Sequence, residues 1–166
     1  AGLLPLGAGM FHAWRSGRTF AYVTASHLPK DWNGLKFFKA SGLGFMEDEL
    51  RKVKEAFLQD MKTSSKRGKP EVVNTDSVKD AYIKHLVSRI MPKKSMKVVL
   101  DTGNGAAGVL AGELFQRGGF DVHVISETID GSFPLRSPDP VTDELTELKD
   151  NLNGRDIGIA YDGDGD

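Results

Sequence analysis

Three aspartates alternate with glycine at the end of the sequence, directly after an apolar run typical of a buried strand. Asp162, Asp164 and Asp166 would face the same way in extended backbone, and the intervening glycines let the chain curl so that the carboxylates converge. Like charges at close range repel strongly unless a cation lies between them. Carboxylate oxygens select Mg²⁺ or Ca²⁺. The pattern therefore favours a metal site, and an exposed acidic turn is the alternative.

A glycine-rich turn lies between another strand-like run and a helical pattern. Gly103, Gly105 and Gly108 satisfy the spacing G-x-G-x-x-G, which is typical of dinucleotide-binding turns. Asp101 argues against that function, because its charge would face an incoming pyrophosphate at the tip of the strand. From these residues alone, a dinucleotide site and plain strand–helix packing both stay open.

A serine and a histidine stand together at the end of a third strand-like run, and a lysine follows on the next run. Ser26 is a weak nucleophile unless a base or a metal assists it. His27 and Lys36 can move protons or hold phosphate charge. An ordinary polar loop explains the same spacing equally well, and the sequence lacks the G-x-S-x-G elbow of many hydrolases.

Apolar periodicity and turn residues predict the helices and strands that must position these three groups of residues. Helices are expected over 6–16, 46–60, 77–90, 105–117 and 143–152, and strands over 20–24 (a buried strand), 35–39, 96–100, 120–125 and 156–161. Ser77 is the expected N-cap of the third helix, and the basic segment 62–70 is the expected linker. The alternation of strands and helices in the second half predicts an α/β fold with partly parallel pairing.

Composition excludes several other classes of protein. The chain has 166 residues and a formal net charge of −1, which gives no support for a nucleic-acid partner. It has no cysteine, so a disulfide framework, a thiolate zinc site and a thiol nucleophile are excluded. No apolar run approaches the ~20 residues that a membrane span needs. The absence of a targeting signal and of cysteine predicts a cytoplasmic location.

Taken together, these three groups of residues resemble one family, the α-D-phosphohexomutases (phosphoglucomutase and phosphomannomutase). Four motifs of that family appear in the family's order: T-A-S-H-x-P-x-x-x-N-G-x-K at 24–36, D-x-G-N-G-x-x-G at 101–108, D-G-x-F-P…P-x-P at 130–140 and D-G-D-G-D at 162–166. The dinucleotide hypothesis explains none of the other three motifs. The sequence departs from the family pattern at Leu28, where asparagine is usual, and at Leu135-Arg136-Ser137, which replaces a more polar stretch.

The resemblance implies two α/β/α layered units with mixed, partly parallel sheets, both incomplete. Residues 1–73 would be the C-terminal part of the family's first domain, which carries the active-serine loop. Residues 74–166 would be the N-terminal part of the second domain, ending in the metal loop. Family members have four domains, and the segments that read the sugar and grip its phosphate are not among these residues. The chain is therefore expected to be a fragment without mutase turnover.

The resemblance also implies a mechanism. Ser26 would carry a phosphoryl group and exchange it with the 1- and 6-positions of a hexose, so the partners would be a hexose phosphate and a hexose 1,6-bisphosphate, with no nucleic acid or membrane. Asp162, Asp164 and Asp166 would hold Mg²⁺, with a phosphate oxygen on Ser26 as a further ligand. Lys36 would act as general acid/base or as a charge partner, and His27 would help to position the phosphoserine.

Two rival functions remain beside the mutase. In a Mg²⁺-dependent phosphatase-like domain, Asp162 would itself be the nucleophile and Asp164 the acid/base, but Gly165 and Asp166 fit that pattern poorly. The second rival is a non-catalytic module that binds a metal or phosphate.

Overall fold

The computed structural model describes residues 2–60, 74–90 and 95–166 of the chain. The expected linker at 62–70 lies outside these residues. In chain order the elements are α1 (Leu6–Ser16), β1 (Phe20–Val23), β2 (Leu35–Phe38), α2 (Glu47–Asp60), α3 (Thr75–Val87), β3 (Lys97–Asp101), the 3₁₀ helix η1 (Ala106–Val109), α4 (Ala111–Arg117), β4 (Asp121–Ile125), α5 (Thr146–Asp150) and β5 (Ile157–Ala160). The predicted α/β class is confirmed, with two sheets of different kind.

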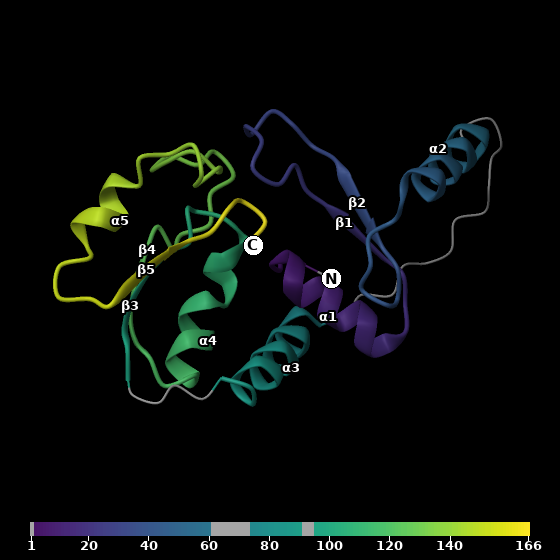
Figure 1. Ribbon diagram of the computed structural model, residues 1–166. Helices are drawn as coiled ribbons and strands as arrows, with labels where there is room; N and C mark the ends of the chain where they lie inside the picture. Colours follow the sequence, from purple (N-terminus) through teal and green to yellow (C-terminus); the bar gives the residue numbers. More distant parts are fainter. Residues whose placement is uncertain (1, 61–73, 91–94) are drawn as a thin grey trace.

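The second half of the chain forms a parallel sheet in the order β4-β3-β5 (Figure 1). Its central strand β3 is buried on both faces, as expected for an uninterrupted run of branched apolar residues in a parallel sheet. Val98 and Leu100 pack against Ala107 and Ala111 from η1 and α4 on one face. Val99 packs on the other face, which α5 covers. The predicted β-α-β order with partly parallel pairing is therefore confirmed.

The first half contains an antiparallel pair, β1 and β2, in which Phe20 lies opposite Phe38. Residues alternate along β1: Phe20 is partly buried while Val23 is 66% exposed. The prediction of a buried strand over 20–24 is therefore wrong. The reason is that α1 covers one face of the pair, where a Cβ on Gly9 would collide with the Phe20 ring.

Helix α3 connects the two halves, lying beside α1 and α4 (Figure 1). One buried cluster draws residues from all three helices and from the segment before α1: Leu4, Ala8, Val78, Ile83, Leu110 and Leu114. The two halves therefore share a hydrophobic core. The domain boundary at 73/74 stays a prediction.

Three predicted helix boundaries are wrong, each for a local reason. The N-cap of α3 is Asn74, whose side chain accepts from the N–H groups of Asp76 and Ser77, so Ser77 lies inside the helix. The helix expected over 105–117 is two helices, because the backbone of Leu110 (φ −147°) interrupts it. The helix expected from 143 begins at Thr146, because Leu145 is in the left-handed region (φ 52°).

Helix α2 forms as predicted, although none of its residues is buried. Its start is stabilised locally, since the Met46 N–H donates to the Glu49 carboxylate and acidic residues fill the first turn. Its apolar face is exposed, with Phe57 64% and Met46 70% accessible in the part of the chain that the structure describes. None of the described helices is both long and apolar enough to cross a membrane.

Candidate active site

The serine loop begins where β1 ends. The Thr24 hydroxyl oxygen accepts from the Ser26 N–H at 2.7 Å, which closes a tight turn. Ser26 itself lies in the left-handed region (φ 56°). That conformation is uncommon for a residue other than glycine, and such backbone strain concentrates at functional sites. The turn presents the partly buried Ser26 hydroxyl at the end of the strand.

The carboxylate loop, residues 162–166, follows β5 and folds around the side chain of its first aspartate. Asp162 Oδ1 accepts from the N–H groups of Asp164, Gly165 and Asp166 at 3.0, 2.9 and 3.2 Å. Gly165 supplies the positive φ (+87°) that this curl requires. The loop therefore brings one carboxylate oxygen from each aspartate to within 4.8 Å of the others. Asp162 and Asp164 are buried, and Asp166 is exposed.

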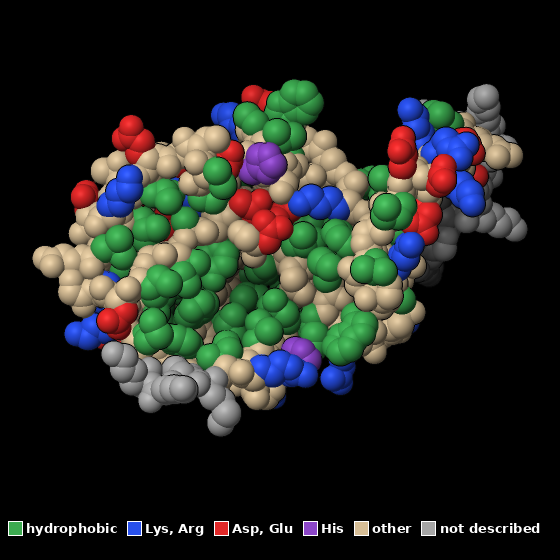
Figure 2. All heavy atoms as spheres, viewed as in Figure 1, with side chains coloured by type: hydrophobic (Ala, Val, Ile, Leu, Met, Phe, Trp, Pro, Cys, Tyr) green, Lys and Arg blue, Asp and Glu red, His purple; other side chains and the backbone are tan. Residues whose placement is uncertain are grey.

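The two loops meet through side chains from both halves of the molecule. Ser26 Oγ donates to Asp162 Oδ2 at 3.1 Å. Lys36, from β2, donates to Ser26 Oγ at 3.0 Å and to Asp164 Oδ2 at 2.8 Å. Thr24 Oγ1 donates to the same Asp164 oxygen at 3.0 Å. The structure thus brings together the predicted serine, lysine and aspartates. Figure 2 shows acidic side chains gathered beside a basic one at the centre of this face.

Two backbone N–H groups, each at the N-terminus of a helix, donate hydrogen bonds to carbonyl groups of the carboxylate loop. Leu6, at the start of α1, donates to the Asp164 carbonyl at 2.9 Å, and Ala106, at the start of η1, donates to the Gly163 carbonyl at 3.1 Å. A Cβ on Gly105 would lie only 2.9 Å from the Gly163 carbonyl oxygen. The glycine-rich turn therefore packs against the chain's own carboxylate loop, where the dinucleotide hypothesis needed room for a pyrophosphate.

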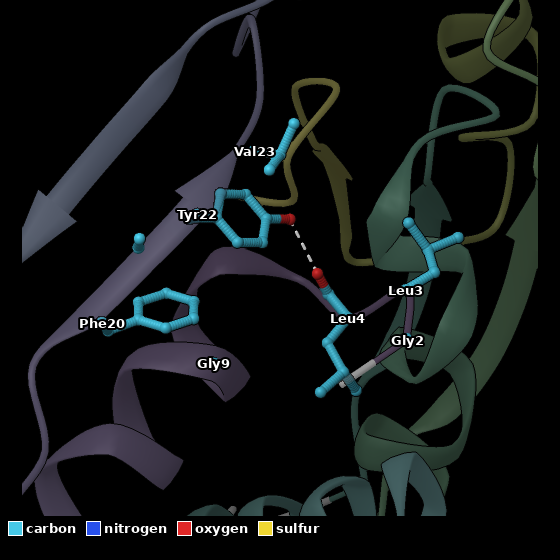
Figure 3. Close-up of a pocket in the computed structure, with 8 residues that line it drawn as sticks. Gly2, Leu3, Leu4, Gly9, Phe20, Tyr22 and Val23 are labelled. Carbon is cyan, nitrogen blue, oxygen red and sulfur yellow. Dashed lines mark hydrogen bonds between the residues drawn. The ribbon is translucent and has the colours of Figure 1, made fainter. Parts of the chain in front are cut away.

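The concentration of carboxylates perturbs nearby groups. Burial, followed by the negative charges of Asp164, Asp162 and Asp166, raises the pKa of Tyr22 to about 12. Figure 3 shows the Tyr22 hydroxyl pointing at the Leu4 carbonyl, to which it donates at 2.7 Å. Burial, followed by the other two aspartates, also raises the pKa of Asp166. The loop thus carries more negative charge than its surroundings neutralise.

One oxygen of the loop lacks a partner. Asp164 Oδ1 is buried and has no hydrogen-bond partner among the described residues. A buried, unpaired carboxylate oxygen is costly unless a further group satisfies it. The donor set consists of hard oxygens from three clustered aspartates, which suits a divalent cation such as Mg²⁺. The residues present therefore fit the metal that the sequence predicted.

His27 forms no hydrogen bond with the other predicted site residues. Its side chain is exposed. Hydrogen bonds from Val141 and Thr142, followed by the nearby His27, lower the pKa of Asp139, which lies in the proline-rich loop, the loop that contains Pro134, Pro138 and Pro140. The predicted role of His27 in positioning a phosphoserine stays a prediction.

Sequence reasoning missed two residues that shape the site. In the sequence, Thr24 is one position of the serine motif, whereas in the structure its hydroxyl contacts both loops. In the sequence, Tyr22 is one residue of an expected strand, whereas in the structure its pKa is raised partly by the three aspartates. The available signal was alternation along β1, since Tyr22 and Thr24 share a strand face that leads toward the serine turn.

Two family models match this chain. The model "Phosphoglucomutase/phosphomannomutase, alpha/beta/alpha domain II" matches residues 80–166, and the corresponding model for domain I matches residues 2–64. The chain belongs to the phosphoglucomutase/phosphomannomutase family. The family assignment predicted from the four motifs is thereby confirmed.

Similar proteins carry mutase names. A phosphomannomutase/phosphoglucomutase of Pseudomonas syringae is 35% identical over 156 residues, which is 91% of this chain and 32% of that protein. A probable phosphoglucosamine mutase of Methanothermobacter thermautotrophicus is 33% identical over 147 residues, which is 87% of this chain and 32% of that protein. The chain thus spans about a third of the length of these relatives.

Solved structures support the same fold. A phosphoglucomutase/phosphomannomutase family protein from Burkholderia thailandensis matches with a TM-score of 0.79 and 32% identity, over 98% of this chain and 37% of that one. A phosphomannomutase-like structure from Thermus thermophilus matches with a TM-score of 0.82 over 99% of this chain and 39% of that one. The latter is 23% identical, so it bears on the fold alone.

Proposed function

We propose that this chain carries the phosphoserine and metal-binding part of a phosphohexomutase active site, which moves a phosphoryl group between the 1- and 6-positions of a hexose. The observation that carries the proposal is the position of the Lys36 ammonium, which donates to both the Ser26 hydroxyl and Asp164. The groups that we propose as nucleophile, proton donor and metal ligand thus lie in one hydrogen-bonded group.

Asp162, Asp164 and Asp166 would hold Mg²⁺, with an oxygen of the phosphoryl group on Ser26 as a further ligand. The chemistry that the ion supplies when bound is neutralisation of negative charge on the phosphoryl oxygens. The chain's own part is preorganisation. The three N–H groups on Asp162 Oδ1 fix the loop before any ligand arrives, and preorganised charge is the main source of catalysis in phosphoryl transfer.

Lys36 would act on the serine oxygen. When the bond between Ser26 Oγ and phosphorus breaks and a bond from a sugar hydroxyl oxygen to phosphorus forms, Lys36 would give a proton to Oγ, and the sugar hydroxyl would release its own proton to water. In the reverse direction, the neutral amine would take the proton from the serine hydroxyl as Oγ attacks the sugar phosphate, and the leaving sugar oxygen would take a proton from water. Lys36 is about one-third exposed, so its proton can exchange with solvent between the two steps.

The substrates proposed for the complete enzyme are hexose phosphates, with a hexose 1,6-bisphosphate as the intermediate that turns over between the two transfers. The relatives are named for mannose, glucose and glucosamine phosphates, so the class of sugar is shared and the particular hexose is left open. Turnover requires that the remote phosphate be gripped in both orientations. The described residues offer one cationic group at the site, Lys36, so we propose that this chain alone does not turn over.

Transfer of labelled phosphate tests the proposal. We expect incubation of the complete enzyme with ³²P-labelled glucose 1,6-bisphosphate and Mg²⁺ to label Ser26, with label lost in Ser26→Ala and retained in the control Ser16→Ala. Neutral hydroxylamine cleaves acyl phosphates and spares phosphoserine. Hydroxylamine-labile label on Asp162 would favour the phosphatase-like function, and absence of label in a complete enzyme that binds Mn²⁺ would favour a non-catalytic module. Either result would overturn the proposal.

A further inference from the structure

The guanidinium of Arg136 forms hydrogen bonds with three segments of the chain next to the carboxylate loop. The side chain is 6% exposed and forms an ion pair with Asp101, which is 2% exposed, at 2.6 Å between Nε and Oδ2. Its Nη2 donates to the Tyr161 carbonyl at 2.6 Å, and its Nη1 donates to the Ser137 carbonyl at 2.8 Å. One planar group therefore bonds the end of β3, the end of β5 and the proline-rich loop.

The contact with Tyr161 lies at the base of the carboxylate loop, because Tyr161 directly precedes Asp162. The Tyr161 N–H donates to the Asp101 carbonyl at 3.0 Å, so the N–H and the carbonyl of Tyr161 are both hydrogen-bonded. Asp101 Oδ1 in turn accepts from the Gly103 N–H at 2.9 Å. Gly103 has a positive φ (+55°), and a Cβ there would collide with the guanidinium. The glycine-rich turn thus leaves room for Arg136.

We propose that Arg136 is a positioning residue for the carboxylate loop. It fixes the direction in which the chain leaves β5, and thereby the placement of Asp162 and the carboxylates that follow. As a statement about metal binding, this rests on the proposed function. Lysine cannot replace arginine here, because one ammonium on a flexible stem cannot bond Asp101, Tyr161 and Ser137 with the fixed geometry of a planar fork.

A substitution with a matched control tests the proposal. Arg136→Lys keeps the positive charge beside Asp101 and removes the fork. Arg155→Lys is the control, since Arg155 pairs with Asp121 on the surface of the same sheet unit. The amides of Leu6 and Ala106 report the loop's position, because each donates to a loop carbonyl. Hydrogen exchange by NMR measures the protection of both amides without any metal.

We expect Arg136→Lys to raise the exchange rates of the Leu6 and Ala106 amides about tenfold while the amides of Val99 and Leu100 in β3 keep their protection. Mn²⁺ binding, followed by electron paramagnetic resonance, is expected to weaken at least fivefold. Arg155→Lys should change neither quantity. Unchanged exchange at Leu6 and Ala106, or a uniform rise that includes β3, would overturn the proposal, because the second result describes a purely structural ion pair.

A second variant covers the case in which Arg136→Lys does not fold. The double variant Asp101→Asn with Arg136→Gln removes both buried charges, and the asparagine oxygen can still accept from the Gly103 N–H. It is expected to show the same local loss of protection at Leu6 and Ala106, and normal protection there would overturn the proposal. If the unmodified chain binds no Mn²⁺, the proposed function fails, and the exchange measurement still decides the role of Arg136.

Discussion

The two halves of the molecule are stabilised in different ways. In the second half, the central strand β3 is almost fully buried, with Val98, Val99 and Leu100 at most 1% exposed and helices on both faces of the sheet. In the first half, β1 and β2 form a two-stranded sheet in which Leu35 is 57% exposed. A two-stranded sheet alone is marginally stable in water, so this pair depends on α1, which covers one of its faces.

This difference assigns different roles to the two halves of the site. The carboxylate loop extends from β5, an edge strand paired with the buried β3. The residues of β5 are exposed or partly buried, so the prediction of a buried strand before the aspartates is wrong. The backbone of the loop is held by the N-termini of η1 and of α1. The serine loop extends from the exposed pair, and its hydroxyl, its threonine and the lysine of β2 all bond to the carboxylate loop. The second half therefore acts as the scaffold, and the serine half is positioned against it.

The largest expected effect contrasts the two sheets directly. Leu100→Ala should lower the free energy of unfolding by ~2–5 kcal/mol, because it leaves a cavity in the fully buried centre of β3. Leu35→Ala in β2 should change it by no more than about 0.5 kcal/mol, since the side chain is mostly exposed. Urea unfolding of both variants measures the difference. Equal losses would contradict the division into scaffold and positioned half.

The next effect concerns the contact between the glycine-rich turn and the carboxylate loop. Gly105→Ala places a methyl group 2.9 Å from the Gly163 carbonyl oxygen, so the loop backbone must shift. We expect a cost of about 1–3 kcal/mol in unfolding free energy together with weaker Mn²⁺ binding. Gly44→Ala is the control, since a Cβ there meets nothing within 4 Å. Unaltered Mn²⁺ affinity in Gly105→Ala would show that the loop tolerates displacement.

A smaller effect is expected from the bridge between the loops. Thr24→Val keeps the shape of the side chain but removes its hydrogen bonds to Asp164 and to the Ser26 N–H. Each lost bond costs about 0.5–1.5 kcal/mol. Hydrogen exchange should therefore increase in the serine loop and remain unchanged in β3, while the exposed control Thr19→Val should alter neither region. Increased exchange in β3 as well would mean that the halves are more tightly coupled than we infer.

The smallest effect is a dependence on alkaline pH. The pKa of Tyr22 is raised to about 12 from an ordinary value of 10, mainly by burial and then by the aspartates. A raised pKa favours the neutral phenol in the folded state, so the stabilisation is complete below pH 10 and is lost as the pH rises through 12. Unfolding free energy should fall less steeply between pH 10 and 11 in Tyr22→Phe than in the unmodified chain. Identical slopes would contradict the shift.

Much of the fold could be predicted from the sequence, since the number of strands in the parallel sheet and their order along the chain follow from short apolar runs. The order of the strands within the sheet, β4-β3-β5, was not predicted. The pattern does not show which residues pack together in the folded chain. The split between η1 and α4 depends on the backbone of Leu110, and the exposure of Val23 depends on β1 having one covered face. Asn74, and not Ser77, is the N-cap of α3. Asparagine and serine are both favoured at an N-cap, so residue type alone does not decide between them.

For the site, the motifs predicted which residues could do chemistry, and the structure brings Ser26, Lys36 and the aspartates together. The residues that place them could not be predicted in the same way. Arg136 lies in a stretch that departs from the family pattern, and its ion pair with Asp101 joins residues 35 apart in the sequence. Spacing identifies functional groups, whereas long-range contacts decide their positions.

The hydrogen bonds between the two loops have a consequence for the order of folding. Thr24 and Asp164 are 140 residues apart, Ser26 and Asp162 are 136 apart, and Lys36 and Asp164 are 128 apart. Contacts of such separation close large loops of chain, and they form late because the entropy of closure must be offset by structure already in place. On a growing polypeptide, the serine loop emerges well before residues 162–166. Ser26 therefore lacks its hydrogen bond to Asp162, and Lys36 its hydrogen bond to Asp164, until β5 has joined the sheet.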